Sequence, residues 1–345
     1  MGLNNFRREY FDLLGEMGRS VEKAANLNEK KREILLAECP MGKLYKYCNI
    51  ETAAKILPNS TILLQTPDNF NDPFDCLTGV ARFDNQTQFS PSANDIEFIK
   101  DQLNKLPTKY RPDEFKLLHN LRIAYSFVLT CFSAEPKKHL MWSHYANSHR
   151  GICLEYNSED LINDIHPCYY TDDLSPHDWS KNSKSLALIK NIAWEYEREW
   201  RFVKTSSRPR MRLLGQVLPE IYNRVHTDSK FSREDHEEWS TINSDIMQSL
   251  EKIFVQERTL SIRPNRVILG ARFSKNFSNE STLENCKSIV RTARKLTIPI
   301  WLTRTSKNNF QLYEEEIARE NSTSLDFDPE LRASLPANVS DTGWL

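Results

Sequence analysis

Three long β-prone runs, each set apart by polar or helical sequence, limit what this chain can fold into more than any other feature. They are RIAYSFVLTCFS (122–133), NRVILGARFS (265–274) and TIPIWLTRTS (297–306), with an amphipathic helical pattern at 281–296 between the last two. Shorter strand-like runs lie at 43–49, 61–66, 151–157 and 166–173. The chain therefore predicts an α+β fold, with a mixed, mostly antiparallel sheet of roughly six to eight strands flanked by helices.

Helical patterns frame this sheet and indicate domain limits. Residues 3–38 carry apolar side chains at three- and four-residue spacing, which predicts an N-terminal helical hairpin with its break at Asn26 to Asn28. Further helices are expected at 50–58, 137–151 and 182–193. We divide the chain into a helical appendage (1–40), a main α+β domain (41–317) with a polar excursion (80–115) and a largely helical insertion (213–258), and an irregular tail (318–345).

Composition narrows the setting of the protein. A formal net charge of -1 over 345 residues argues against a wholesale nucleic-acid-binding surface. Seven cysteines without a CxxC pair fit a reducing cytosol better than a secreted disulfide framework. The N-terminus is charged where a signal peptide needs an apolar run, and no stretch approaches a membrane-spanning length. A cytoplasmic protein that does not interact with membranes is therefore expected.

The motif FNDPFD (70–75), which follows a predicted strand, has two interpretations. In the structural one, Asn71 or Asp72 bonds the backbone downstream, the proline fixes a bend, and both phenylalanines anchor that bend in the core. Asp72 and Asp75 are then turn and cap residues. In the functional one, Asn71 or Asp75 holds a ligand on this rigid bend.

The motif MWSHYA (141–146) is expected on a helix, where Met141 and Tyr145 share a face. Trp142, His144 and Tyr145 lie close enough in sequence to stack a planar base or a nicotinamide ring. The structural alternative makes the apolar members a core stripe and His144 a hydrogen-bonded structural residue.

The motif WEYEREWRF (194–202) concentrates charge. As a strand it would place Glu195, Glu197 and Glu199 on one face together with Arg201, and as a helix it would pair Glu197 with Arg201. Carboxylates this close repel one another unless a cation lies among them. Arg201 is one such cation, and Lys46 or a ligand could be another. The motif has two interpretations. In the structural one, it is a solvated edge strand. In the functional one, one of its carboxylates stabilises positive charge at a sugar C1 or activates a nucleophile.

The order of these motifs resembles a prokaryotic family known as domain of unknown function 2971. LYKY, FNDPFD, CFS, MWSHYA, GICLEY, YEREWRF and VILG follow one another over residues 43–305, and FNDPFD with MWSHYA makes the resemblance fairly specific. The family name supplies no reaction. The resemblance implies that the matching positions are Lys46, Tyr47, Phe70, Asn71, Asp72, Pro73, Phe74, Asp75, Trp142, His144, Tyr145, Glu197, Glu199 and Arg201.

The layout is also similar, more weakly, to that of ADP-ribosyltransferase-like toxins. This resemblance implies NAD as a substrate, Tyr145 or Tyr47 against the nicotinamide ring, and Glu197 or Glu199 as the catalytic acid. Lys46 stands where His or Arg is usual, and no Ser-Thr-Ser-type strand motif is evident. The likeness is one of fold-level layout.

Three functional hypotheses follow. The first is a nucleotide-directed enzyme that cleaves NAD or transfers ADP-ribose, in bacterial defence or a toxin system, to an acceptor that the sequence does not identify. The second is a non-catalytic binding or regulatory module. The third is a metal-dependent nuclease using Asp75, Glu197 and Glu199. GxGxxG, Walker A and GxSxG patterns and zinc-type spacing are missing from the sequence, and no metal is expected.

Overall fold

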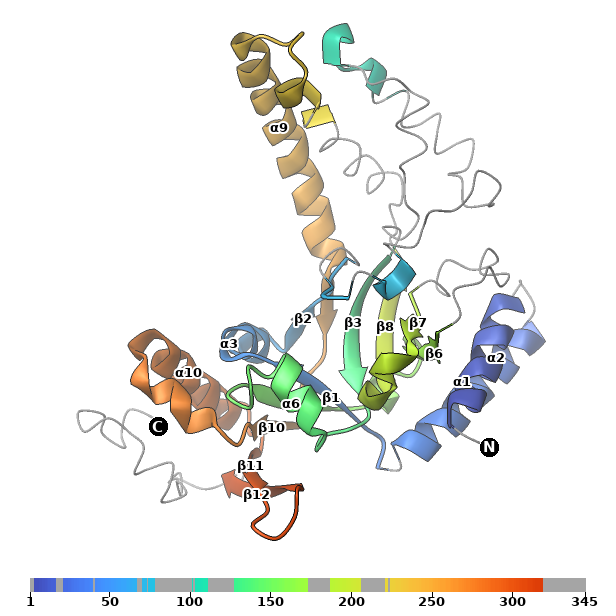
Figure 1. The fold of residues 1–345 in the computed structure, drawn as a ribbon, viewed down its shortest axis with the longest axis vertical. Helices are drawn as coiled ribbons and strands as arrows, with labels where there is room; N and C mark the ends of the chain where they lie inside the picture. Colours follow the sequence, from blue (N-terminus) through green and yellow to red (C-terminus); the bar gives the residue numbers. More distant parts are fainter. Residues whose placement is uncertain are drawn as a thin grey trace.

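The β-prone runs come together in one eight-stranded sheet in the computed structural model of the chain (Figure 1). Neighbouring strands of this sheet pair antiparallel, except for β10 and β11, which pair parallel. This confirms the predicted α+β fold with a mixed, mostly antiparallel sheet. In spatial order the strands are β12 (Leu312–Ala318), β11 (Ile300–Thr305), β10 (Arg266–Leu269), β4 (Ile152–Asn157), β1 (Lys43–Cys48), β3 (Phe127–Ser133), β8 (Glu199–Thr205) and β5 (Ile165–Pro167).

The structure describes residues 3–16, 21–39, 41–66, 70–72, 74–77, 101, 103–110, 127–172, 187–205, 221–222 and 224–318. Most of the predicted polar excursion (80–115) and the predicted tail beyond residue 318 lie outside these residues. Two further two-stranded sheets pair β2 (Thr61–Leu63) with β9 (Thr259–Ser261), and β6 (Tyr169–Thr171) with β7 (Ile189–Asn191). Within this part of the chain, no helix is long and apolar enough to cross a membrane.

Helices pack on the sheet and form the apolar core together with it. α1 (Leu3–Glu16) packs against α2 (Val21–Glu38), as the predicted helical pair requires, and α3 (Ile50–Asn59) packs against α10 (Glu280–Lys295). These helices share one large apolar core with the sheet, whereas α6 (His139–Tyr145) packs over Tyr45 and Tyr47 of β1 in a smaller cluster. α9 (Arg233–Glu257) projects away from the sheet (Figure 1). The predicted domain limits themselves stay a prediction.

Three local predictions are wrong. The expected break at 26–28 lies inside α2, where the buried Leu27 is held by packing despite its asparagine neighbours. The expected helix at 182–193 contains β7 instead. WEYEREWRF is neither one strand nor one helix: a 3₁₀ helix (Ile192–Glu197), begun by the Asn191 side chain accepting the Ala193 N–H at 2.9 Å, ends at a left-handed Arg198, and β8 follows.

Two further strands depart from the sequence pattern. The run HPCYYTDD, expected as one strand, divides into β5 and β6 in separate sheets. β12 was not expected, because its LYEEEIA sequence has three consecutive glutamates. Leu312 and Ile317 nevertheless give it buried apolar contacts, and β11 pairs along its length.

The connection from α6 to β4 is a left-handed turn packed tightly against β1. Asn147, Ser148 and His149 all have positive φ, at 45°, 54° and 68°, a conformation that side chains other than glycine rarely adopt. Gly151 ends the turn so close to β1 that an added Cβ would overlap the carbonyl oxygen of Cys48. Glycine at this position therefore allows two backbones to meet beside the site described below.

We expect Gly151→Ala to lower the free energy of unfolding by about 2 kcal/mol or more, because the new methyl group meets backbone atoms that cannot rotate away. Urea denaturation followed by circular dichroism measures the change. Lys307→Ala, at an exposed loop position, is the control and should shift stability by no more than about 0.5 kcal/mol. An unchanged denaturation midpoint in Gly151→Ala would contradict the close approach of the two backbones.

Candidate functional site

The principal cavity opens where two central strands separate. β1 and β3 pair at only one register position, Tyr45 opposite Ser133, and beyond it the strands diverge. Gln65, which follows β2, bridges to Leu129 of β3 and bounds the far side of the opening. The resulting cavity measures about 820 Å³. It is lined by residues of β1, β2, β3, α3, α6 and the 70–75 bend, by Lys190 of β7, by Glu197 at the end of the 3₁₀ helix and by Glu199 at the start of β8.

Eight of the ten predicted site residues line this cavity. Trp142 and Arg201 do not. Trp142 is fully buried, donates its indole N–H to the Pro136 carbonyl at 2.9 Å and meets Tyr47 edge to face, so it supports the wall from behind. The eight lining residues are Lys46, Tyr47, Asn71, Asp75, His144, Tyr145, Glu197 and Glu199.

A buried ionic cluster forms the floor of the cavity, and Arg201 organises it. Its guanidinium is fully buried and bonds both carboxylate oxygens of Asp75, at 2.7 and 2.8 Å, and Glu199, at 2.8 and 3.2 Å. It also donates to the Ala187 carbonyl at 2.7 Å. Burial alone would raise the pKa of Glu199, but the charges of Arg201 and Lys190 outweigh it and hold that pKa below its usual range.

The second cation of the cluster, Lys190 on β7, escaped the sequence analysis. Its Nζ lies 2.5 Å from Glu197, 2.7 Å from Glu199 and 3.9 Å from Asp75. The sequence had offered Lys46 or a ligand as this further cation, and the LIKN sequence around Lys190 carries no motif that marks it. A cation among the carboxylates was correctly required on electrostatic grounds, and only the fold could identify which residue supplies it.

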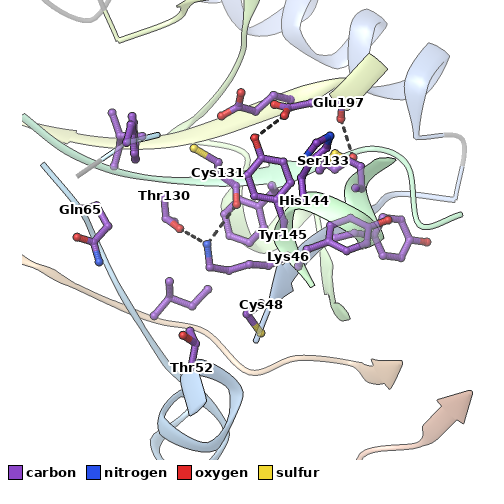
Figure 2. A pocket seen from close by; sticks show the side chains of 18 of the residues that line it. Lys46, Cys48, Thr52, Gln65, Thr130, Cys131, Ser133, His144, Tyr145 and Glu197 are labelled. Atoms are coloured by element: carbon purple, nitrogen blue, oxygen red, sulfur yellow. Dashed lines mark hydrogen bonds between the residues drawn. The ribbon is translucent and has the colours of Figure 1, made fainter. Parts of the chain in front are cut away.

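Glu197 is the carboxylate of the cluster whose protonation state changes near neutral pH. It ends the 3₁₀ helix, and Ser133 of β3 donates to its backbone carbonyl at 2.6 Å. Its side chain accepts a hydrogen bond from the Tyr145 hydroxyl at 2.6 Å (Figure 2). It accepts a second one from the Lys190 ammonium. Burial, and then the negative charge of Glu199, raise the pKa of Glu197 to about 7. A carboxyl group with this pKa can exchange a proton at neutral pH.

Lys46 of β1 also lines the cavity, and both of its hydrogen-bond partners are neutral. Its ammonium donates to the Thr130 hydroxyl at 2.6 Å and to the Cys131 carbonyl at 3.3 Å (Figure 2). Among the described residues, no carboxylate lies within 4.0 Å of it, and burial lowers its pKa. A partly buried cation without a counter-ion is well placed to meet an anionic group of a ligand.

The bend at 70–75 is partly structural. Asp72 accepts the Phe74 N–H at 2.9 Å, which confirms its predicted turn role, and Phe70 packs on the core beneath Arg201. The prediction that both phenylalanines are anchored in the core is wrong for Phe74, which is 53% exposed. Asp75 does more than cap the bend, because it is the carboxylate that ties this segment to Arg201.

The aromatic candidates occupy different places. Tyr145 reaches the ionic cluster, whereas the Tyr47 hydroxyl is already bonded to the Glu135 carbonyl. His144 is exposed at the rim, where its ring meets the edges of Tyr145 and Trp194. Of the predicted ring-stacking residues, Tyr145 and His144 are thus the two whose side chains are close to Glu197 at the cavity (Figure 2).

The carboxylates are not arranged as a metal centre. Asp75 and Glu199 are both engaged by Arg201, so their oxygens face a guanidinium. Across the described ranges, no group of three or more His, Cys, Asp or Glu side chains is placed to hold a metal ion. The geometry gives the nuclease hypothesis no support.

Comparison with known proteins gives a family match over part of the chain. Residues 141–202 match a family described as protein of unknown function (DUF2971), which confirms the predicted resemblance for this segment. The segment runs from within α6 through β4, β5, β6, β7 and the 3₁₀ helix to the first residues of β8, whereas Lys46 and Asp75 lie outside it. No curated protein matches the chain, and no solved structure matches it.

We expect Arg201→Met to lower the free energy of unfolding by about 3–5 kcal/mol, because it leaves Lys190, among the described residues, as the single cation paired with the three buried carboxylates of the cluster. Chemical denaturation measures the loss. Arg233→Met is the matched control: the Arg233 side chain is 92% exposed, and its pair with Glu237 should be worth less than about 0.5 kcal/mol. Equal effects of the two substitutions would contradict a stabilising role for the buried cluster.

The pKa of Glu197 makes a prediction about pH. The folded state holds this proton up to about pH 7, whereas an unfolded glutamate releases it near 4.5, so the stability it contributes is lost as pH rises through this window. Wild-type protein should lose about 2 kcal/mol relative to Glu197→Gln between about pH 5.5 and about pH 8. Glu195→Gln, an exposed position on the same 3₁₀ helix, should follow the wild type. Parallel pH profiles of wild type and Glu197→Gln would contradict the raised pKa.

Proposed function

We propose that the protein is an enzyme acting on NAD or a related nucleotide, which breaks the bond between nicotinamide and ribose C1 and passes ADP-ribose to water or to an acceptor macromolecule. The observation that carries this proposal is the Glu197 carboxylate. It lines the cavity, is held by Tyr145 and Lys190, and titrates near neutral pH. The weaker layout resemblance to ADP-ribosyltransferase-like toxins points to the same reaction class.

The charge balance of the cavity floor supports a cationic reacting centre. Three carboxylates (Asp75, Glu197 and Glu199) are compensated by two cations (Lys190 and Arg201) when all are ionised. One negative charge is in excess, and Glu197 is the member that gives it up by taking a proton. A pyridinium ring or an oxocarbenium-like sugar beside Glu197 would favour its ionised form.

Two lysines of the cavity support an anionic group on the same ligand. Lys46 has no carboxylate partner within 4.0 Å among the described residues, and Lys55 of α3 lines the same cavity. NAD combines a cationic nicotinamide with an anionic diphosphate, so it matches both kinds of charge in the lining. The cavity volume of about 820 Å³ lies within the range usual for small-molecule and cofactor sites.

The reaction balances as a glycosidic substitution. The C1–N bond breaks with its electron pair going to the nicotinamide nitrogen, which becomes neutral, while the ionised Glu197 stabilises the positive charge left on the ribose. Water or an acceptor hydroxyl then bonds to C1 and releases its proton, for which Glu197 is the nearby base. Tyr145 and Lys190 position the carboxylate throughout.

The setting we propose is the cytoplasm of a bacterium, where the activity would act in defence or as a toxin. All seven cysteines are unpaired, as a reducing compartment favours. The acceptor macromolecule is left to experiment.

The proposal is tested by incubating purified protein with NAD labelled in the nicotinamide and the adenylate, with and without cell lysate. We expect release of nicotinamide in the wild type and a loss of about 100-fold or more in Glu197→Gln. Glu195→Gln is the matched control, because the same chemical change falls two residues away on an exposed side chain. Glu199→Gln tests the neighbouring carboxylate, and its stability must be measured alongside because Arg201 depends on it.

Two outcomes would reject the proposal. The first is full activity in both Glu197→Gln and Glu199→Gln, which would reject a catalytic role for these carboxylates. The second is saturable nucleotide binding by folded wild-type protein with no turnover in lysate, which would establish the non-catalytic binding module in its place.

A further inference from the structure

The chain turns a corner at Glu195–Glu199, where the 3₁₀ helix ends and β8 begins, and this corner presents Glu197 to the main cavity. A second cavity borders the same corner. Glu195, Tyr196 and Arg198 line this polar cavity of about 430 Å³, together with Glu135 and Lys138. The other wall of this cavity is formed by Asn4, Arg7 and Glu38 of the N-terminal helices, with Tyr170 of β6. Position of the corner therefore depends on discrete polar contacts more than on apolar packing.

Arg7 of α1 supplies the central contacts. It is buried at 2% exposure, and its guanidinium forms a two-pronged pair with Glu38 of α2, at 2.7 and 2.6 Å. The same guanidinium donates to the backbone carbonyls of Cys168 at 2.6 Å and Glu199 at 3.0 Å. One side chain thus joins the helical pair to the first residue of β8.

Tyr170 and Trp200 make further hydrogen bonds at the start of β8. The Tyr170 hydroxyl accepts the Glu199 N–H at 2.7 Å, and the Trp200 indole donates to Glu38 at 2.8 Å. Arg7 also lies over both aromatic rings, 5.2 Å from the Tyr170 centroid and 5.9 Å from that of Trp200. Both backbone polar groups of Glu199 are therefore fixed from the side opposite the main cavity.

We propose that Arg7, held by Glu38, is a positioning residue of the site: by fixing the backbone of Glu199 it sets where the adjoining Glu197 carboxylate lies between Tyr145 and Lys190. The N-terminal helical pair, which lies outside the segment matched to the family, is then a working part of the site. Its effect on turnover rests on the proposed function, whereas its effect on the position and ionisation of Glu197 does not.

The test replaces Arg7 by Lys, which keeps the charge but cannot hold Glu38 and two carbonyls with one planar fork. Carbon-13 NMR of the glutamate side chains follows the titration of Glu197, assigned with Glu197→Gln. We expect its pKa to fall by about one unit or more, because a displaced carboxylate is less buried. In the labelled-NAD assay, we expect kcat to fall about tenfold or more with a smaller change in KM.

Lys30→Met is the matched control. Lys30 of α2 bridges to Glu9 of α1 at 2.5 Å, so it also links the two helices, but Glu9 is half-exposed and the pair does not reach β8. If Arg7 served only to hold the helices together, Lys30→Met would resemble Arg7→Lys. We expect Lys30→Met to leave the Glu197 titration unchanged.

The proposal is overturned if folded Arg7→Lys protein titrates Glu197 as the wild type does. Should that variant fail to fold, Tyr170→Phe decides, because it removes only the hydroxyl that accepts the Glu199 N–H. A wild-type titration of Glu197 in Tyr170→Phe would then reject the positioning role. If the wild-type protein does not turn over NAD but the Glu197 titration is shifted in Arg7→Lys, the proposed function is rejected and the positioning role of Arg7 stands.

Discussion

The buried guanidinium of Arg201 is the contact on which the rest of the site depends. It joins the 70–75 bend through Asp75, its own strand through Glu199, and the segment before β7 through the Ala187 carbonyl. A guanidinium keeps its proton in proteins, and together with Lys190 its charge holds the pKa of Glu199 below the usual range. Exchange of a proton at neutral pH is therefore left to Glu197, which is bonded to Lys190 and Tyr145 instead.

The sheet could be predicted because its strongest strands carry their own signal. The 122–133, 265–274 and 297–306 runs are rich in β-branched and aromatic residues, and each contributes a strand. β12 could not be found in this way, since its glutamates mask a strand that forms through pairing with β11. The 182–193 error has a similar origin: β7 is three residues long and is defined by its pairing with β6, not by its own pattern.

The site was predictable where chemistry is concentrated in the sequence and unpredictable where it is dispersed. FNDPFD, MWSHYA and WEYEREWRF mark Asp75, Tyr145 and Glu197, and the fold brings all three to one cavity. Lys190 and Arg7 lie 115 and 68 residues from Asp75 in the sequence. Only tertiary structure shows that Lys190 contacts the Asp75 carboxylate and that Arg7 bonds the backbone carbonyl of Glu199. Isolated charged residues on separate elements leave no local pattern to read.

The raised pKa of Glu197 has a consequence for the proton balance of binding. A cation beside Glu197 lowers the pKa of that carboxyl group, so its binding near neutral pH releases protons to the solvent. The affinity for a cationic ligand therefore falls as the pH drops through the pKa of Glu197. The cavity thus holds positively charged molecules less tightly in acid than at neutral pH.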